Sequence, residues 1–142
     1  MHTILIAHHD AVYAEQLAGK LRTWGYHVID CPGPLPPVAR CIRCDKGYCP
    51  LTEGADLMIY DPHLTAFDDA GHEHNLATES AVAHPDVPML LAWSPDAVPD
   101  NGTLRAIRAV APWVHVAAHT PEGLGRQIHD LIAASLTSAT PV

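Results

Sequence analysis

Residues 3–24, TILIAHHDAVYAEQLAGKLRTW, decide the fold. The first five residues of this stretch are apolar and rich in β-branched side chains, which is typical of a buried strand. The polar cluster HHD follows at 8–10, and beyond it the apolar residues recur with helical spacing at Val12, Leu17, Leu21 and Trp24. Asp10 suits a helix N-cap. The stretch therefore predicts a strand at 3–7 followed directly by a helix at 11–24.

The same succession of strand and helix continues along the chain. Further strands are predicted at 26–30, 55–61, 87–93 and 113–118, and further helices at 77–84, 103–111 and 121–135. Short strands that alternate with helices favour a parallel sheet with helices on both faces. We expect an α/β fold with one domain over 1–136, a five-stranded parallel sheet and a flexible tail at 137–142. The proline-rich and cysteine-rich segment 32–54 is expected to form an irregular loop insertion in place of the second helix.

Composition and charge narrow the class of function. The 142 residues are 48% hydrophobic and carry eight Lys and Arg against sixteen Asp and Glu, a net charge of −8. An acidic chain does not favour binding to nucleic acid or to anionic membranes, because both need cationic surface. We find neither a membrane-spanning run nor a signal peptide, so we expect a cytoplasmic protein.

Polar residues gather where the predicted strands end. They are His8, His9 and Asp10 after the first strand, Cys31 after the second, Asp61 after the third and Ser94 after the fourth. In open parallel sheets, functional sites form outside the carboxyl ends of the strands. This edge of the sheet is therefore the first candidate site.

The segment 3–28, together with ADLMIYDPHL at 55–64 and VPMLLAWS at 87–94, resembles the receiver domain of bacterial response regulators. The resemblance covers nearly the whole chain apart from 32–54, and it implies a flavodoxin-like, receiver-like fold. It also implies that Asp61, with Pro62 after it, lies where the family has its phosphoacceptor. In that family an acidic pair after the first strand holds Mg²⁺, a Thr or Ser ends the fourth strand, and a Lys ends the fifth.

This sequence departs from the family at those positions. The acidic pair falls on His8 and His9, which leaves Asp10 as the nearest acid. The hydroxyl position falls on Trp93, with Ser94 one residue beyond, and the lysine position falls on Ala117. Phosphoryl transfer to a carboxylate needs a metal ion and a cation to neutralise charge, and imidazoles do not replace carboxylates as Mg²⁺ ligands. The sequence therefore predicts a degenerate acid pocket in which Mg²⁺ is not expected.

The same edge could hold a different metal. His8, His9, Asp10 and Asp61 offer imidazole and carboxylate ligands, a mixture that Zn²⁺ or Fe²⁺ accepts. Consecutive residues of a strand point to opposite faces, so His8 and His9 converge only if the chain turns directly after Ala7. We therefore expect a strand end with solvated histidines, and we take the polar GHEH segment at 71–74 as a solvated loop.

The cysteines form a second candidate site. Cys41, Cys44 and Cys49 have C-x2-C-x4-C spacing, and Cys31 stands at the end of the second predicted strand. Four thiolates can complete a Zn²⁺ site or hold an iron–sulfur cluster, and Zn²⁺ is the favoured ion. The alternatives are a buried Cys31 with exposed loop thiols, or a reversible disulfide within the loop.

These observations predict a stand-alone, receiver-like signalling or interaction module. We expect it not to be an enzyme, not to be phosphorylated in the usual way, and to act through a protein partner or self-association. One alternative is a working phosphoacceptor of a two-component system that uses Asp61 with Asp10. Another is a metal- or redox-sensing protein, or a metalloenzyme, that uses the cysteine loop or the His8, His9 and Asp61 edge.

Overall fold

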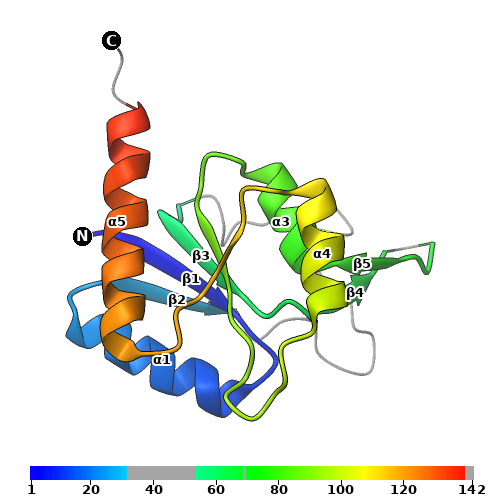
Figure 1. The fold of residues 1–142 in the computed structure, drawn as a ribbon, viewed down its shortest axis with the longest axis horizontal. Helices are drawn as coiled ribbons and strands as arrows, with labels where there is room; N and C mark the ends of the chain where they lie inside the picture. Colours follow the sequence, from blue (N-terminus) through cyan, green and yellow to red (C-terminus); the bar gives the residue numbers. More distant parts are fainter. Residues whose placement is uncertain (32–53, 69, 140–142) are drawn as a thin grey trace.

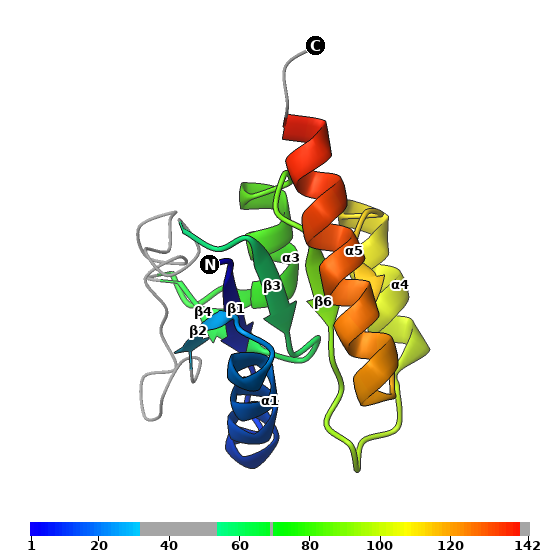
Figure 2. The ribbon, with the colours of Figure 1, turned by 90° about the vertical axis from the view of Figure 1, so that its left-hand side faces the viewer.

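The computed structural model describes residues 1–31, 54–68 and 70–139. A five-stranded sheet forms its centre, with the strand order β2-β1-β3-β6-β7. The strands are β1 (Thr3–Ala7), β2 (His27–Cys31), β3 (Leu57–Tyr60), β6 (Met89–Leu91) and β7 (His115–Val116). All four pairings are parallel, so the carboxyl ends of the strands lie at the same edge (Figure 2). The predicted five-stranded parallel sheet is confirmed.

Helices cover both faces of this sheet. They are α1 (Ala11–Thr23), α3 (Leu76–Ala83), α4 (Asn101–Val110) and α5 (Pro121–Ala139). Helices α1 and α5 lie on one face, and α3 and α4 lie on the other (Figure 1). Helix α5 extends to Ala139, beyond the end predicted at 135 and across the predicted start of the tail at 137.

Successive side chains of the strands point to opposite faces of the sheet and contribute to two apolar cores. In β1, Ile4 and Ile6 pack with the buried residues of α1 and α5, whereas Leu5 and Ala7 pack with those of α3 and α4. Every residue of β3 is buried. A strand covered on both faces must be apolar on both, which explains the continuous hydrophobic runs in the sequence.

Helix α1 begins as the sequence predicts, but its buried face differs. The Asp10 carboxylate accepts a hydrogen bond from the backbone N–H of Tyr13 at 3.0 Å and so caps the helix. The buried positions are Ala14, Leu17, Ala18 and Leu21. Val12 is 67% exposed, and the prediction that it shares this face is wrong. Two small alanines complete the i, i+3, i+4, i+7 pattern because they let the helix approach the sheet closely.

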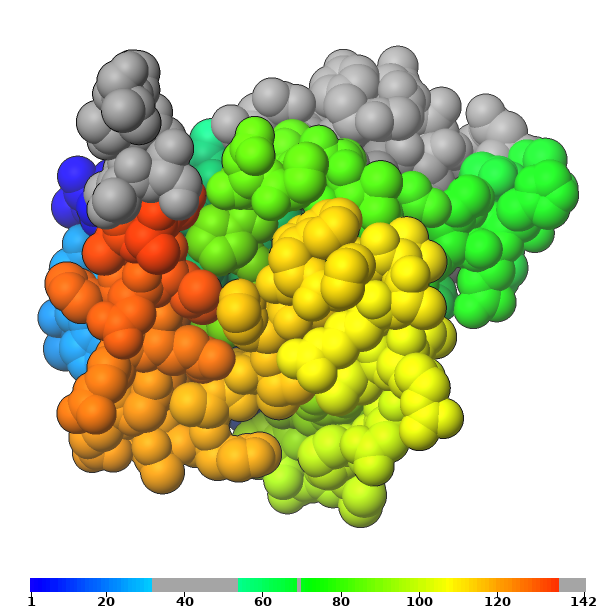
Figure 3. Space-filling model, turned by 45° about the horizontal axis from the view of Figure 1, so that its top comes forward, coloured from blue at the N-terminus to red at the C-terminus, as the bar shows by residue number. Residues whose placement is uncertain are grey.

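A β-hairpin interrupts the segment between β3 and α3. Its strands β4 (Thr65–Phe67) and β5 (Glu73–Asn75) pair antiparallel. Gly71, with φ +82°, lies in its turn, where the backbone N–H of Gly71 donates to the Asp68 carbonyl at 3.0 Å. The hairpin projects from the body of the molecule beside α4 (Figures 1 and 3). The prediction of a solvated loop at 71–74 is confirmed at Gly71 and His72, which are exposed and lie outside the strands, and is wrong at Glu73 and His74, which lie in β5.

The outer edge of β7 is closed by a side chain from α5. Gln127 donates from Nε2 to the carbonyl of Val116 at 2.8 Å, and its Oε1 accepts from the backbone N–H of Ala118 at 2.8 Å. Both backbone groups face away from β6, because Ala117 between them bonds to Leu91. Gln127 thus takes the place of a further strand.

Two sequence predictions fall outside the described residues: the irregular loop with Cys41, Cys44 and Cys49, and the last residues of the tail. Among the residues that the structure does describe, no helix combines the length and apolar character needed to cross a membrane.

Candidate functional site

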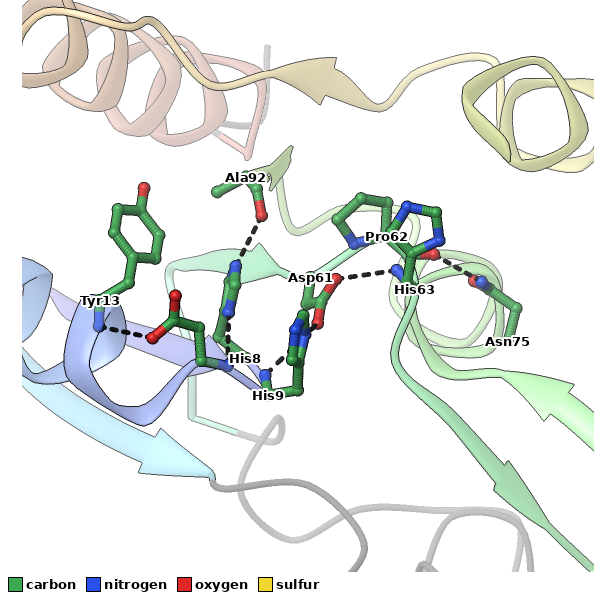
Figure 4. A network of polar contacts seen from close by, with 9 residues as sticks. His8, His9, Tyr13, Asp61, Pro62, His63, Asn75 and Ala92 are labelled. Atoms are coloured by element: carbon green, nitrogen blue, oxygen red, sulfur yellow. Dashed lines mark hydrogen bonds and ion pairs between the residues drawn. The ribbon is translucent and has the colours of Figure 1, made fainter. Parts of the chain in front are cut away.

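The candidate site lies where β1 and β3 end side by side. Ala7 and Tyr60 are partners in the parallel ladder, so the residues after them leave the sheet at the same level. The Asp61 backbone N–H donates to the Ala7 carbonyl at 2.8 Å and extends this register by one residue. His8, His9 and Asp61 consequently come together at the edge (Figure 4).

Asp61 is buried, with 1% of its surface exposed, and both of its carboxylate oxygens have partners. Oδ1 accepts a hydrogen bond from the backbone N–H of His63 at 2.9 Å. Oδ2 accepts from the backbone N–H of His9 at 3.3 Å and also contacts Nδ1 of the His9 ring. The carboxylate is therefore fixed in orientation by residues that follow both strands.

His8 is also buried, with 1% exposure, so the prediction of a solvated histidine is wrong at this position. Its Nε2 lies 2.8 Å from the carbonyl of Ala92, and its Nδ1 lies 3.1 Å from the backbone N–H of Asp10. A carbonyl only accepts and an N–H only donates, so the ring carries its proton on Nε2. Burial lowers the pKa of His8 below its usual value, which favours this neutral form.

His9 is exposed, and its ring stacks on that of His8 with centroids 5.3 Å apart. The chain bends directly after β1, which is the condition for the two histidines to converge. His8, His9 and Asp61 each place one potential ligand atom within 4.8 Å of the others. In the described residues this is the one group of three or more His, Cys, Asp or Glu side chains so arranged.

Asp10 stands beside this group rather than in it, because its carboxylate caps α1. The hydrogen bond from the Tyr13 backbone lowers the pKa of Asp10, with a smaller contribution from the Ser94 hydroxyl. Ser94 lies beyond the end of β6, and its oxygen completes no well-aligned hydrogen bond within the described residues. Asp10, the acidic residue nearest to the pocket in the sequence, is thus engaged at the N-terminus of the helix.

The end of β7 carries no lysine. Ala117 follows the strand, and the nearby His119 is exposed. His119, Trp93 and Ser94 line the same cavity between the ends of β6 and β7, and Nε1 of Trp93 is buried there without a hydrogen-bond partner among the described residues. A cation that could balance a phosphoryl group is therefore not found at the position where the resemblance places one.

The cysteine site can be followed only in part. Cys31 ends β2, is half-buried and packs against the core beneath α3. Cys41, Cys44 and Cys49 lie outside the described residues. The site with four cysteine ligands remains a prediction.

A second polar cluster, on the hairpin, was missed at the sequence level. His74 lies 2.8 Å from Asp68 through Nε2 and 2.8 Å from Glu79 through Nδ1, and His72 lies 3.4 Å from Asp68. The carboxylates of Asp68 and Glu79 raise the pKa of His74, and the hydrogen bond from His74 lowers the pKa of Asp68. The sequence signal that could have revealed this cluster is HEHN at 72–75, where histidines alternate with an acidic and an amide residue. This pattern fits a short polar strand.

Solved structures with this architecture include response regulator receiver domains. A receiver domain protein from Methanospirillum hungatei aligns with a TM-score of 0.65 at 14% identity, over 98% of this chain and 99% of its own. One from Clostridium thermocellum aligns at 0.64 and 13%, over 96% and 98%. The non-phosphorylated receiver domain of HemR from Leptospira biflexa aligns at 0.58 and 18%, over 94% and 95%.

These similarities establish the fold: the chain has the flavodoxin-like, receiver-like architecture that the sequence predicts. No protein-family model and no curated protein sequence matches it significantly.

The resemblance to receiver domains implies a Mg²⁺ ion at this edge, and the residues present do not fit one. Mg²⁺ requires hard oxygen ligands in octahedral geometry. Of the four candidates, His8 and His9 offer nitrogen, Asp10 is engaged at the helix N-cap, and Asp61 alone supplies a carboxylate at the cluster. The donor set is that of a softer ion.

Proposed function

We propose that this chain is a receiver-like signalling module that is not phosphorylated in the usual way and acts by binding a protein partner. The observation that carries the proposal is the pairing of the buried Asp61 carboxylate with His9, at the position where the resemblance expects an acidic pair. The overall fold supports the signalling class, and the residues at the strand ends argue against phosphotransfer.

The physical argument concerns charge. A carboxylate that attacks a phosphoryl group brings two anions together, so the transition state needs a metal ion and a cation close by. The ligand set does not suit Mg²⁺, and Ala117 follows β7 where a lysine is expected. In addition, both oxygens of Asp61 already accept hydrogen bonds from backbone N–H groups, which makes the carboxylate a weaker nucleophile.

Output through a partner follows from the same argument. A module that does not switch by phosphorylation transmits its signal by changing what it binds. The exposed apolar side chains of Val110 and Trp113 lie at the end of α4 and just after it. In receiver-like domains the last helix and the last two strands commonly supply the interaction surface, and we expect the partner, or a second copy of the chain, to bind there.

The test is incubation with a small phosphodonor, acetyl phosphate, in the presence of Mg²⁺, followed by intact mass measurement. We expect no phosphorylated species in the wild-type chain. Asp61→Asn is the informative variant, and Asp86→Asn, an exposed aspartate at the opposite edge of the sheet, is the matched control. Stoichiometric phosphorylation that Asp61→Asn abolishes and Asp86→Asn leaves intact would establish the working phosphoacceptor instead.

The cysteine loop remains part of the proposal as a structural metal site. Cys31, Cys41, Cys44 and Cys49 have the ligand type and number for Zn²⁺. Elemental analysis of protein purified without a histidine tag tests this site. A brown colour with visible absorbance would indicate an iron–sulfur cluster in place of Zn²⁺.

A further inference from the structure

We propose that His8, His9 and Asp61 form a binding site for a divalent transition metal ion, with Zn²⁺ the best-suited ion. This inference goes beyond the proposed function, because it requires neither a partner nor a phosphoryl group. It is also separate from the predicted cysteine site, since none of the three ligands is a cysteine.

The positions of the ligands suit one ion. The three ligand atoms lie within 4.8 Å of one another. Tetrahedral Zn²⁺ with bonds of about 2.0–2.1 Å places its ligand atoms roughly 3.3 Å apart. Bringing the most widely separated ligand atoms to this spacing needs a movement of up to about 1.5 Å, whereas Nδ1 of His9 and Oδ2 of Asp61 are in direct contact and must move apart to admit the ion. The His9 side chain can make both movements because it is 60% exposed and its ring is not packed in the core.

The buried ligand is already oriented. The carbonyl of Ala92 holds the proton of His8 on Nε2, which leaves the lone pair of Nδ1 for an ion. A carbonyl behind a histidine ligand is the usual outer partner that fixes the ring and its tautomer at metal sites. At His8 the ion must displace the hydrogen bond of 3.1 Å from the Asp10 backbone to Nδ1, and between the other two ligands it must replace the contact of His9 Nδ1 with Asp61 Oδ2.

Asp61 is likewise held from behind. Oδ1 accepts from the backbone of His63, so Oδ2 is the oxygen directed toward the two histidines (Figure 4). The arrangement places two nitrogens and one oxygen on neighbouring strand ends, with the exposed side of His9 open to solvent. Three protein ligands with one open position is the pattern of a zinc site that also binds water or a ligand from a partner.

The ligand chemistry selects the ion. Imidazole suits Zn²⁺, Cu²⁺, Fe²⁺ and Ni²⁺, whereas Mg²⁺ and Ca²⁺ require oxygen ligands. We therefore expect the full chain to bind Zn²⁺ and Co²⁺ and to bind Mg²⁺ far more weakly.

The experiment first eliminates metal binding by the cysteine loop. Untagged protein carrying Cys41→Ser, Cys44→Ser and Cys49→Ser serves as the parent, and Zn²⁺ is titrated into it in a calorimeter. We expect one equivalent to bind. His9→Ala or Asp61→Asn in this parent should weaken binding by about tenfold or more, since even outer partners of metal ligands change affinity on this scale.

Two controls sharpen the result. His129→Ala removes an exposed histidine on α5, outside the cluster, and it should bind Zn²⁺ as the parent does. Co²⁺ gives a second readout, because nitrogen and oxygen ligands produce weak visible bands and thiolates add strong charge-transfer absorption. His8 is left intact throughout, because it is buried and its loss would disturb the fold.

Either of two results would overturn the proposal: a parent that binds no Zn²⁺, or a parent whose affinity survives both His9→Ala and Asp61→Asn. The phosphodonor assay remains independent of this outcome. A chain that is phosphorylated can still bind Zn²⁺ in its resting form, and a chain that binds no Zn²⁺ can still be inert to the phosphodonor.

Discussion

The strand-end pocket and the hairpin carry clusters made of the same residue types, yet the two clusters differ in physical character. The pocket joins His8 and His9 to the buried Asp61. The hairpin joins His74 to Asp68 and Glu79, with 30% of the His74 side chain and 21% of the Asp68 side chain exposed. Each cluster brings imidazole nitrogens within bonding distance of carboxylate oxygens.

The difference lies in what surrounds the central imidazole. Backbone groups bind both nitrogens of His8, and burial lowers its pKa, so the ring is a neutral base. Two carboxylates bind both nitrogens of His74 and raise its pKa, which favours the protonated ring. Neutral imidazole offers a lone pair to a metal, whereas protonated imidazole offers none. Of these two clusters, the pocket is therefore the better suited to bind a metal ion.

The largest expected effect comes from removing the buried histidine. His8→Ala should lower the free energy of unfolding by about 2–4 kcal/mol, because it leaves a cavity and deprives the Ala92 carbonyl of its donor. His72→Ala on the hairpin should cost less than about 0.5 kcal/mol, since its side chain is 76% exposed and its contact with Asp68 is a surface pair. Urea unfolding of both variants without added metal measures the contrast, and equal losses would contradict it.

An intermediate effect is expected at Asn75, which links the hairpin to the pocket loop. Its Oδ1 caps α3 through the Thr78 backbone at 2.9 Å, and its Nδ2 donates to the Pro62 carbonyl at 2.8 Å. Asn75→Ala should cost about 1–2 kcal/mol, the usual value of an N-cap with one further hydrogen bond.

Asn75→Asp separates the two contributions, because aspartate keeps the cap and loses the donor. Its unfolding free energy should fall between those of the wild type and Asn75→Ala. A loss as large as that of Asn75→Ala would show that the cap contributes little.

The smallest effect is a pH dependence confined to the hairpin. The pKa of His74 is raised above 6.5 by its carboxylate partners, so its stabilisation is complete below pH 6.5 and is lost as the pH rises through the raised pKa. The stability gap between wild type and His74→Gln should therefore narrow as the pH rises above about 6.5. Urea midpoints at several pH values test this, and a gap that widens with pH would contradict it.

The sheet could be predicted because its strands are buried on both faces. A continuous apolar run such as LMIY at 57–60 is typical of a strand in such a sheet. The hairpin could not be predicted, since β4 and β5 have three residues each and only Ala66 is fully buried. So short a pair is stabilised by its turn and by the helix that follows, and hydrophobic periodicity gives no sign of it.

The candidate site was predictable in its members but not in its geometry. The strand-end rule placed His8, His9 and Asp61 at one edge. Alternation along a strand predicted that the histidines diverge, and the bend after Ala7 removed that restriction. Burial of His8 depends on the Ala92 carbonyl, 84 residues further along the chain, and such a contact leaves no local signal in the sequence.

The glutamine that closes β7 has a consequence for how the molecule meets other proteins. Outward-facing backbone groups on a terminal strand invite a foreign strand to add itself, which is a common route to aggregation. Gln127 occupies the carbonyl of Val116 and the N–H of Ala118, so an incoming strand finds these two groups already bonded. Strand addition on this side is thereby disfavoured, and a single amide restricts how neighbours can dock.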